Sequence, residues 1–117
     1  MSLEDFQLTE NDSLPSLEYT VSRSGSGSTT PNLTDFTVSL KVSSVASTSN
    51  KFTLSVTSSG GDDGQITTPE SGVVQFDWST DNWSSSGTFV GEVSFENAAG
   101  KVETAPNRQT FVVKSEF

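Results

Sequence analysis

The sequence predicts an all-β protein built from two antiparallel sheets packed as a sandwich of seven or eight short strands. Three observations lead to this prediction. Apolar and polar residues alternate with a period of two in several segments, as they do along half-buried strands. Turn-forming residues recur about every 8–12 residues. No window of a dozen residues has the i, i+3, i+4, i+7 apolar spacing of a helix. An up-and-down barrel is the second architecture that fits this pattern.

The 117 residues suit one domain. Only 31% of them are apolar, and 22 Ser and 15 Thr give the chain a composition that also occurs in disordered segments. Eight Phe, two Trp and one Tyr argue for a folded chain, because they are spread over the whole length and lie inside the alternating segments. We expect a thin core rich in Phe and Val beneath a surface of Ser and Thr.

Charge and composition exclude several classes of function. Fifteen Asp and Glu against six Lys and Arg give a net charge of −9, which opposes binding to nucleic acid or to an anionic membrane. The chain has no Cys and no His, so a disulfide, a Cys/His zinc site and a Ser-His-Asp or Cys-His catalytic set are all excluded. No apolar run is long enough to span a membrane.

The chain begins with an acidic lead-in segment, residues 1–13, and the sandwich domain occupies residues 14–117. Phe6 and Leu8 of the lead-in segment are candidates to pair against a sheet edge. In the first half of the domain, the alternation predicts three strands, which are separated by a Ser/Gly loop at 24–31 and a polar connection at 43–50. Their inward-facing residues are Leu17, Tyr19 and Val21; Phe36, Val38, Leu40 and Val42; and Phe52, Leu54 and Val56.

The second half begins with a turn cluster at 58–64, a short strand around Ile66 and a break at Pro69 and Gly72. A polar loop, residues 79–87, follows the next strand, and the turn at 97–100 forms a hairpin with Gly100 at positive φ. The number and spacing of these strands predict the immunoglobulin-like type of sandwich, without its disulfide. The predicted core residues are Phe36, Val38, Leu40, Phe52, Leu54, Val74, Phe76, Trp78, Phe89, Val93, Phe95, Phe111 and Val113.

Acidic residues are the main candidates for chemistry. Asp62 and Asp63 lie between glycines and could offer oxygens to calcium, but the six to eight ligands of a calcium site and the spacing of an EF-hand are not visible. We expect these two residues to favour the turn, and we predict no cofactor and no metal.

A pair of carboxylates could also serve glycoside hydrolysis, which needs a cleft and a separation of about 5–10 Å. The candidates are Asp77, Asp81, Glu92, Glu96 and Glu103. Period-two alternation puts those on strands on the outward faces, where charge provides solubility. We therefore expect no enzyme activity.

The two tryptophans have different settings. Trp78 ends an alternating apolar run and is expected in the core. Trp83 lies in a polar loop with Asp81 and Asn82. An exposed Trp83 could stack on a sugar or anchor a partner, with Asp81 and Asn82 beside it. Alternatively its ring folds back and caps one end of the sandwich.

Four blocks of the sequence resemble the N-terminal domains of phage baseplate upper proteins and their tail-fibre relatives. Residues 32–40 (NLTDFTVSL) are similar to the family pattern D-L-T-G-A-x-V-x-F. The other blocks are 72–79 (GVVQFDWS) for G-x-V-x-Y-D-W-S, 86–93 (SGTFVGEV) for A-G-T-Y-x-A-E-F, and 100–107 (GKVETAPN) within D-G-x-V-E-T-x-P-N. The blocks keep the family's order. The departures are Phe76 and Phe89 for Tyr, Asn32 for Asp, Asp35 for Gly, and a longer loop around Trp83.

The resemblance implies a non-enzymatic structural part of a virion, made in the host cytoplasm and assembled into the phage tail. Such a domain joins the baseplate or fibre to receptor-binding components through protein–protein interfaces, and the assembled particle implies a homo-oligomer. The alternative function is a carbohydrate- or receptor-binding sandwich that uses the Trp83 loop. A small glycosidase-like enzyme is a third, weaker alternative.

Overall fold

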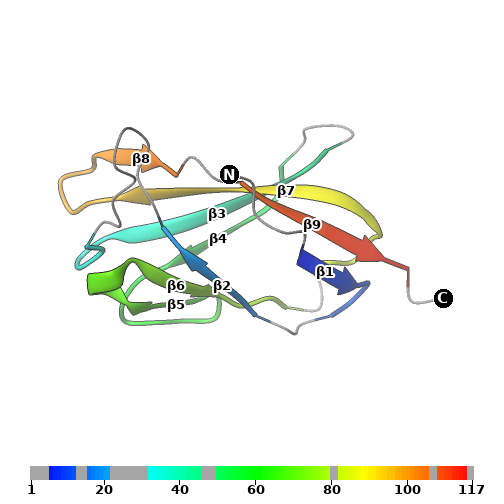
Figure 1. Cartoon of the computed structure of the whole chain (residues 1–117), viewed down its shortest axis with the longest axis horizontal. Helices are drawn as coiled ribbons and strands as arrows, with labels where there is room; N and C mark the ends of the chain where they lie inside the picture. Colours follow the sequence, from blue (N-terminus) through cyan, green and yellow to red (C-terminus); the bar gives the residue numbers. More distant parts are fainter. Residues whose placement is uncertain are drawn as a thin grey trace.

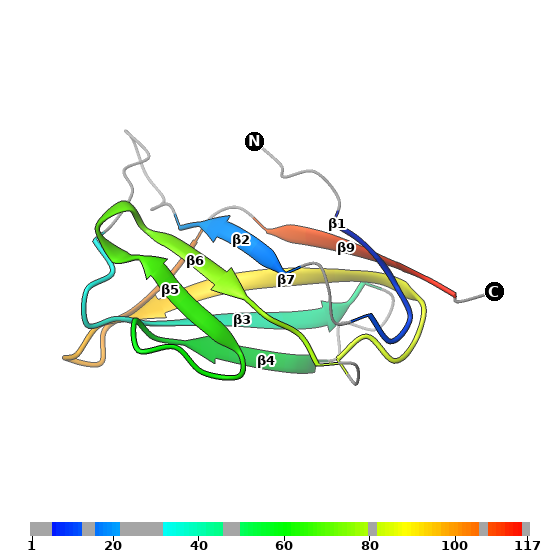
Figure 2. The same ribbon diagram turned by 90° about the horizontal axis from the view of Figure 1, so that it is seen from below.

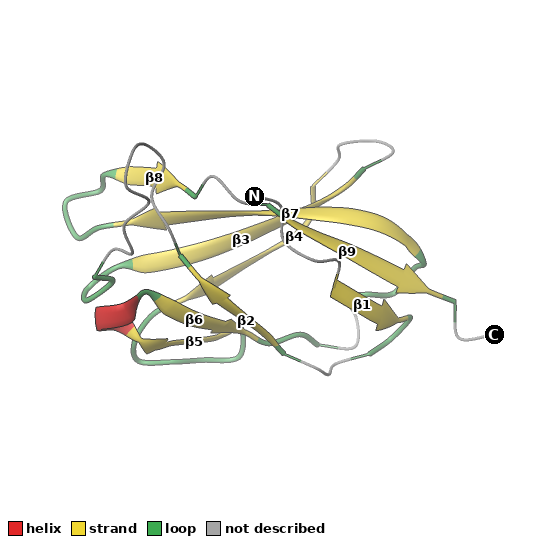
Figure 3. Cartoon of the chain, in the orientation of Figure 1, coloured by secondary structure: helices red, strands yellow, loops and turns green. Residues whose placement is uncertain are grey.

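The computed structural model describes residues 6–12, 16–21, 32–45, 50–79, 82–105 and 108–115. Within these ranges the chain forms nine strands, one 3-10 turn and no α-helix. Figures 1 and 3 show how these elements are arranged. The strands are β1 Phe6–Thr9, β2 Leu17–Thr20, β3 Thr37–Ser44, β4 Asn50–Val56, β5 Gly64–Thr68, β6 Val73–Phe76, β7 Gly87–Glu96, β8 Val102–Thr104 and β9 Gln109–Lys114. The 3-10 turn η1, Pro69–Ser71, separates β5 from β6. The all-β prediction is confirmed: the described part of residues 14–117 contains eight strands, within the predicted seven or eight, and β1 of the lead-in segment adds a ninth.

The strands belong to two sheets. One has the order β1-β9-β7-β3-β4, with β8 also beside β7, and the other has the order β2-β6-β5. Figure 2 shows the three strands of the small sheet side by side in a layer separate from the long strands β3 and β7. The described strands therefore form two sheets and not the closed barrel that was the second architecture.

The pairing of β1 with β9 is parallel, whereas every other described strand pair is antiparallel. The prediction of wholly antiparallel sheets is wrong at this pair. Parallel neighbours need a long connection between them, and β1 and β9 are joined by all the strands from β2 to β8. Phe6 lies opposite Phe111 in the register, so the predicted pairing of Phe6 and Leu8 against a sheet edge is confirmed.

Alternation along the strands determines which side chains form the core. Val38, Leu40 and Val42 of β3 are buried, and the residues between them are half-buried or exposed. Strand β7 buries every second residue from Phe89 to Phe95 in the same way. Because successive side chains of a strand point to opposite faces, each long strand turns one apolar row toward the other sheet.

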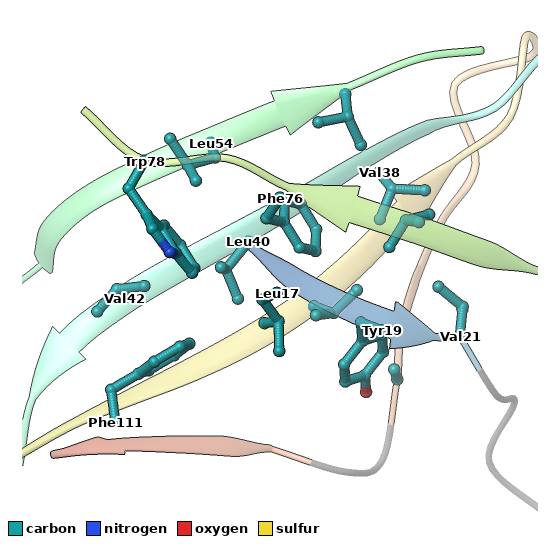
Figure 4. Packing of buried hydrophobic residues seen from close by; sticks show 14 of the residues in the cluster. Leu17, Tyr19, Val21, Val38, Leu40, Val42, Leu54, Phe76, Trp78 and Phe111 are labelled. Atoms are coloured by element: carbon teal, nitrogen blue, oxygen red, sulfur yellow. The ribbon is translucent and has the colours of Figure 1, made fainter. Parts of the chain in front are cut away.

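Buried side chains of both sheets meet in one hydrophobic cluster. Figure 4 shows Leu17 and Phe76 of the small sheet turned toward Leu40 of β3. All but two of the predicted core residues are buried: Val38, Leu40, Leu54, Val74, Phe76, Trp78, Phe89, Val93, Phe95, Phe111 and Val113. Phe36, which precedes β3, and Phe52 of β4 are only partly buried against the cluster.

The core also contains residues that are missing from the predicted core set. These are Leu8, Leu17, Tyr19, Val21, Leu33, Val42, Val56, Ile66, Trp83 and Ala105. Several of them lie in predicted inward-facing rows, but Leu33, Trp83 and Ala105 lie outside the strands. Their burial depends on how loops fold back over the ends of the sheets.

The turn at 97–100 has the predicted hairpin geometry. The Gly100 amide donates to the Asn97 carbonyl at 3.0 Å, and Gly100 has a φ of 86°. The Asn97 side-chain oxygen accepts the amides of Ala99 and Lys101. The predicted loop at 24–31, residues 46–49 of the next connection, and Pro106 and Asn107 before the last strand lie outside the described residues.

Gly91 in the middle of β7 lies in close contact with the core. A Cβ at this position would be 2.8 Å from a methyl carbon of Leu40 and 2.8 Å from the Phe111 ring. Real Cβ atoms do not approach other atoms this closely, so any larger residue must displace those side chains. The backbone of β7 therefore packs directly against Leu40 and Phe111.

Candidate functional site

The loop around Trp83 is the site that the sequence predicts, and hydrogen bonds hold it as a tight turn. The Asn82 side-chain oxygen accepts the Ser79 amide at 2.8 Å, and the Asn82 amide donates to the Ser79 carbonyl at 3.2 Å. The side chain of Asn82 thus closes the loop. Asp81, the other predicted contact residue, lies outside the described residues.

Trp83 is fully buried, with 0% of its surface exposed. Its ring centroid lies 4.9 Å from that of Phe111, 5.0 Å from Phe52 and 5.3 Å from Trp78. Aromatic rings favour such tilted and edge-to-face contacts at these separations. Trp83 therefore caps the core, as one of the two alternatives predicted. The other alternative, an exposed ring stacking on a sugar, is wrong for this residue because neither face is accessible.

Two hydrogen bonds join the Trp83 loop to the chain that follows β1. The Asn11 amide donates to the Trp83 carbonyl at 2.7 Å. The Ser86 amide donates to the Glu10 carboxylate at 2.9 Å. The described part of the lead-in segment thus belongs to the packed domain and helps to hold Trp83 in place.

The acidic candidates are dispersed over both sheets. Asp77 follows β6 of the small sheet, and its carboxylate accepts hydrogen bonds from the Ser16 hydroxyl at 2.6 Å and from the side-chain Nε2 of Gln75 at 2.9 Å. Glu92 and Glu96 share a face of β7, but four residues of strand separate them by about 13 Å. That separation exceeds the roughly 5–10 Å of glycosidase carboxylates, so these two residues do not form such a pair.

Glu103 lies on the opposite face from the one predicted. It is directly opposite buried Phe95 in the register of β8 with β7, so the two side chains share the inner face of the sheet. Its neighbour Val102 is 63% exposed. The prediction is wrong because three residues are too few for alternation to show which face each side chain occupies. The pairing of β8 with β7 determines the face of Glu103.

Of the two adjacent acids at the β4–β5 turn, Asp63 bonds to the backbone and Asp62 is exposed. The Asp63 carboxylate accepts the Ser55 amide of β4 at 3.1 Å, and the Asp63 carbonyl accepts the Asp77 amide at 2.9 Å. Asp63 thus links an edge strand of the large sheet to the small sheet. Among the described residues no group of three or more His, Cys, Asp or Glu could hold a metal ion.

A shallow depression on the outer face of the large sheet was not predicted. Its volume is about 320 Å³, near the lower limit of the roughly 300–1,000 Å³ typical of ligand pockets. We call it the β3–β7 depression. Its lining includes Lys41, Ser43, Val45, Val90, Glu92 and Arg108. The alternation in β3 and β7 indicates that Lys41 and Glu92 face outward, but only the register brings them together with Arg108.

Comparison of the chain with protein-family models, with curated proteins and with solved structures gives no match. The resemblance to phage baseplate domains therefore stays a prediction. In the part of the chain that the structure describes, no helix is long and apolar enough to cross a membrane.

Proposed function

We propose that this chain is a non-enzymatic structural module of a phage tail baseplate or tail fibre. In this proposal it joins the tail to receptor-binding components through protein–protein interfaces, and it self-associates in the assembled virion. The proposal rests on the resemblance of the four sequence blocks and on the backbone conformation at their glycine positions.

The observation that carries the proposal concerns φ angles. Each resembling block has one position that is Gly in the phage family pattern. Here those positions are Asp35, Gly72, Gly87 and Gly100, and their φ angles are 64°, 70°, 143° and 86°. Positive φ favours Gly, and Asp is one of the few other residues that tolerate it near 60°. Asp35 departs from the pattern in identity, but its conformation is the one that a Gly would supply.

We further infer that the two sheets form an immunoglobulin-like sandwich. In a variable-type immunoglobulin domain one sheet contains strands G, F, C and C′, and the other contains B, E and D. With strands matched in chain order, β9-β7-β3-β4 corresponds to G-F-C-C′, and β2-β6-β5 corresponds to B-E-D. The first strand, β1, pairs with the G-equivalent β9. This correspondence in strand order supports an immunoglobulin-like sandwich. The disulfide of immunoglobulin domains is not part of it, because the chain has no Cys.

Hydrogen bonds that occupy amides at the sheet edges favour partner contacts through the faces of the sheets. The Thr9 amide of edge strand β1 donates to the Asp12 carboxylate at 3.0 Å, and the Ser55 amide of edge strand β4 donates to Asp63. Glu103 of β8 points toward the inner face at a third edge. Blocked amides and inward-pointing charges oppose pairing with a strand of another chain.

The genomic neighbourhood tests the proposal. The proposed function predicts that the reading frames beside this one encode tail, baseplate or fibre components. It also predicts that an antibody raised against the domain labels the tails of purified particles. Neighbouring genes unrelated to tail assembly, together with unlabelled particles, would contradict it.

A further inference from the structure

The β3–β7 depression combines cationic and apolar side chains on a strongly acidic protein. Lys41 lies opposite Glu92 in the register of β3 with β7. On the other side of Glu92, an Arg108 guanidinium nitrogen lies 3.2 Å from the Glu92 carboxylate. Three charges therefore cross the sheet in the order positive, negative, positive.

Glu92 balances only one of these two cations. It forms an ion pair with Arg108, whereas Lys41 has no ion pair with any described residue. The depression thus carries a local charge of +1 (two cations less one carboxylate) on a chain of net charge −9. An uncompensated ammonium group in a concave site attracts a carboxylate at short range.

Apolar contacts lie next to these charges. Val45 is 53% exposed, and it lines the depression together with Val90. The Ser43 side chain, opposite Val90 in the register, adds a hydroxyl to the same surface. The depression lies over Gly91, where β7 packs directly against Leu40 and Phe111. The volume of about 320 Å³ suits one or two side chains and not a large ligand.

We propose that the β3–β7 depression is a docking site for a partner protein segment in which a Glu or Asp side chain lies next to an apolar residue. The carboxylate contacts Lys41 and the exposed side of Arg108, and the apolar side chain contacts Val45 and Val90. This inference rests on the proposed function, because it specifies one face at which the module meets a partner. The blocked edges of β1 and β4 are consistent with docking on a face.

Peptide titration of the folded, ¹⁵N-labelled chain tests the site. The probe is a blocked pentapeptide with one Glu between two Leu and a Ser at each end, and its control has Gln in place of Glu. At millimolar peptide we expect amide shifts concentrated at residues 41–45, 90–92 and 108. The Gln peptide should bind about two- to fivefold more weakly, which lies within the range for one exposed ion pair.

Two charge variants should change the affinity for the Glu peptide in opposite directions. Lys41→Gln should weaken binding of the Glu peptide about two- to fivefold, and Glu92→Gln should strengthen it by a similar factor, because it removes the competing carboxylate. Lys101→Gln and Glu96→Gln are the matched controls. They make the same changes in net charge at exposed positions outside the depression, and they should leave affinity unchanged.

Three results would overturn the proposal: equal affinity for the Glu and Gln peptides, amide shifts centred elsewhere, or equal effects of the variants and their controls. Failure of the peptide experiment would remove this docking site and leave the proposed tail function to its own test. Absence of the chain from phage particles would remove the tail function, and a positive titration would still establish the site.

Discussion

The Asp63 carboxylate accepts a hydrogen bond of 3.1 Å from the Ser55 amide on the outer edge of β4. The Asp12 carboxylate likewise accepts a hydrogen bond from the Thr9 amide of β1. These contacts assign a structural role to part of the negative charge. An unpaired amide on an edge strand can donate a hydrogen bond to a strand of another chain. A carboxylate that accepts this amide's hydrogen bond prevents such pairing. Asp12 and Asp63 thus each occupy an amide at a sheet edge.

Replacing Asp63 with Ala should destabilise the domain and expose the β4 edge. Loss of one hydrogen bond should cost about 1 kcal/mol in urea unfolding. The double variant Asp12→Ala/Asp63→Ala should also sediment as larger species than the parent chain at the same concentration. Asp62→Ala is the control, since it removes a neighbouring exposed charge. Equal stability and equal sedimentation of the double variant and this control would contradict edge protection.

Trp83→Ala should be among the most damaging single substitutions. Removing a fully buried aromatic ring costs about 3–5 kcal/mol. Trp83→Phe should cost much less, because Phe keeps most of the ring volume and removes a buried indole N–H that has no hydrogen-bond partner among the described residues. Chemical denaturation measures both. A cost below about 1 kcal/mol for Trp83→Ala would show that the ring is not part of the core.

Gly91→Ala should destabilise the domain by about 1–3 kcal/mol through overpacking against Leu40 and Phe111. Gly61→Ala is the matched control. A Cβ at Gly61 would meet no atom within 4 Å, and its φ is not in the left-handed region. Thermal unfolding of both variants should separate them clearly. If both midpoints shifted by the same amount, the proposed close packing of β7 on the core would be wrong.

Alkaline titration should report the burial of Tyr19. Desolvation by burial raises the pKa of this phenol above its ordinary value of 10.0, because burial disfavours the charged form. The neutral phenol therefore contributes stability that is complete below pH 10.0 and is lost as the pH rises through the higher pKa of the folded state. Tyr19 is the single tyrosine, so tyrosinate absorbance follows it alone. A midpoint at or below that of the urea-unfolded chain would contradict its burial.

The strands could be predicted from sequence where alternation is long enough to define a face. Val38, Leu40 and Val42 of β3 and Phe111 and Val113 of β9 show this, because the period of two is a local property of the chain. Glu103 shows the limit. Its strand has three residues, and only the long-range register with Phe95 determines the face.

The candidate functional surface is harder to predict for the same reason. Trp83 lies in a polar loop, and its burial depends on hydrogen bonds from the chain after β1. Lys41 and Arg108 are far apart in sequence, and they line one depression only because β3 and the start of β9 flank β7. Neither relationship has a local sequence signal.

We propose that the domain joins components of a phage tail. The most direct measurement is co-expression of the full chain with the products of its neighbouring reading frames, followed by affinity purification and determination of the mass of the complex. We expect a stable complex of defined stoichiometry that contains a tail, baseplate or fibre component. Purification of the chain without any of these products would contradict it.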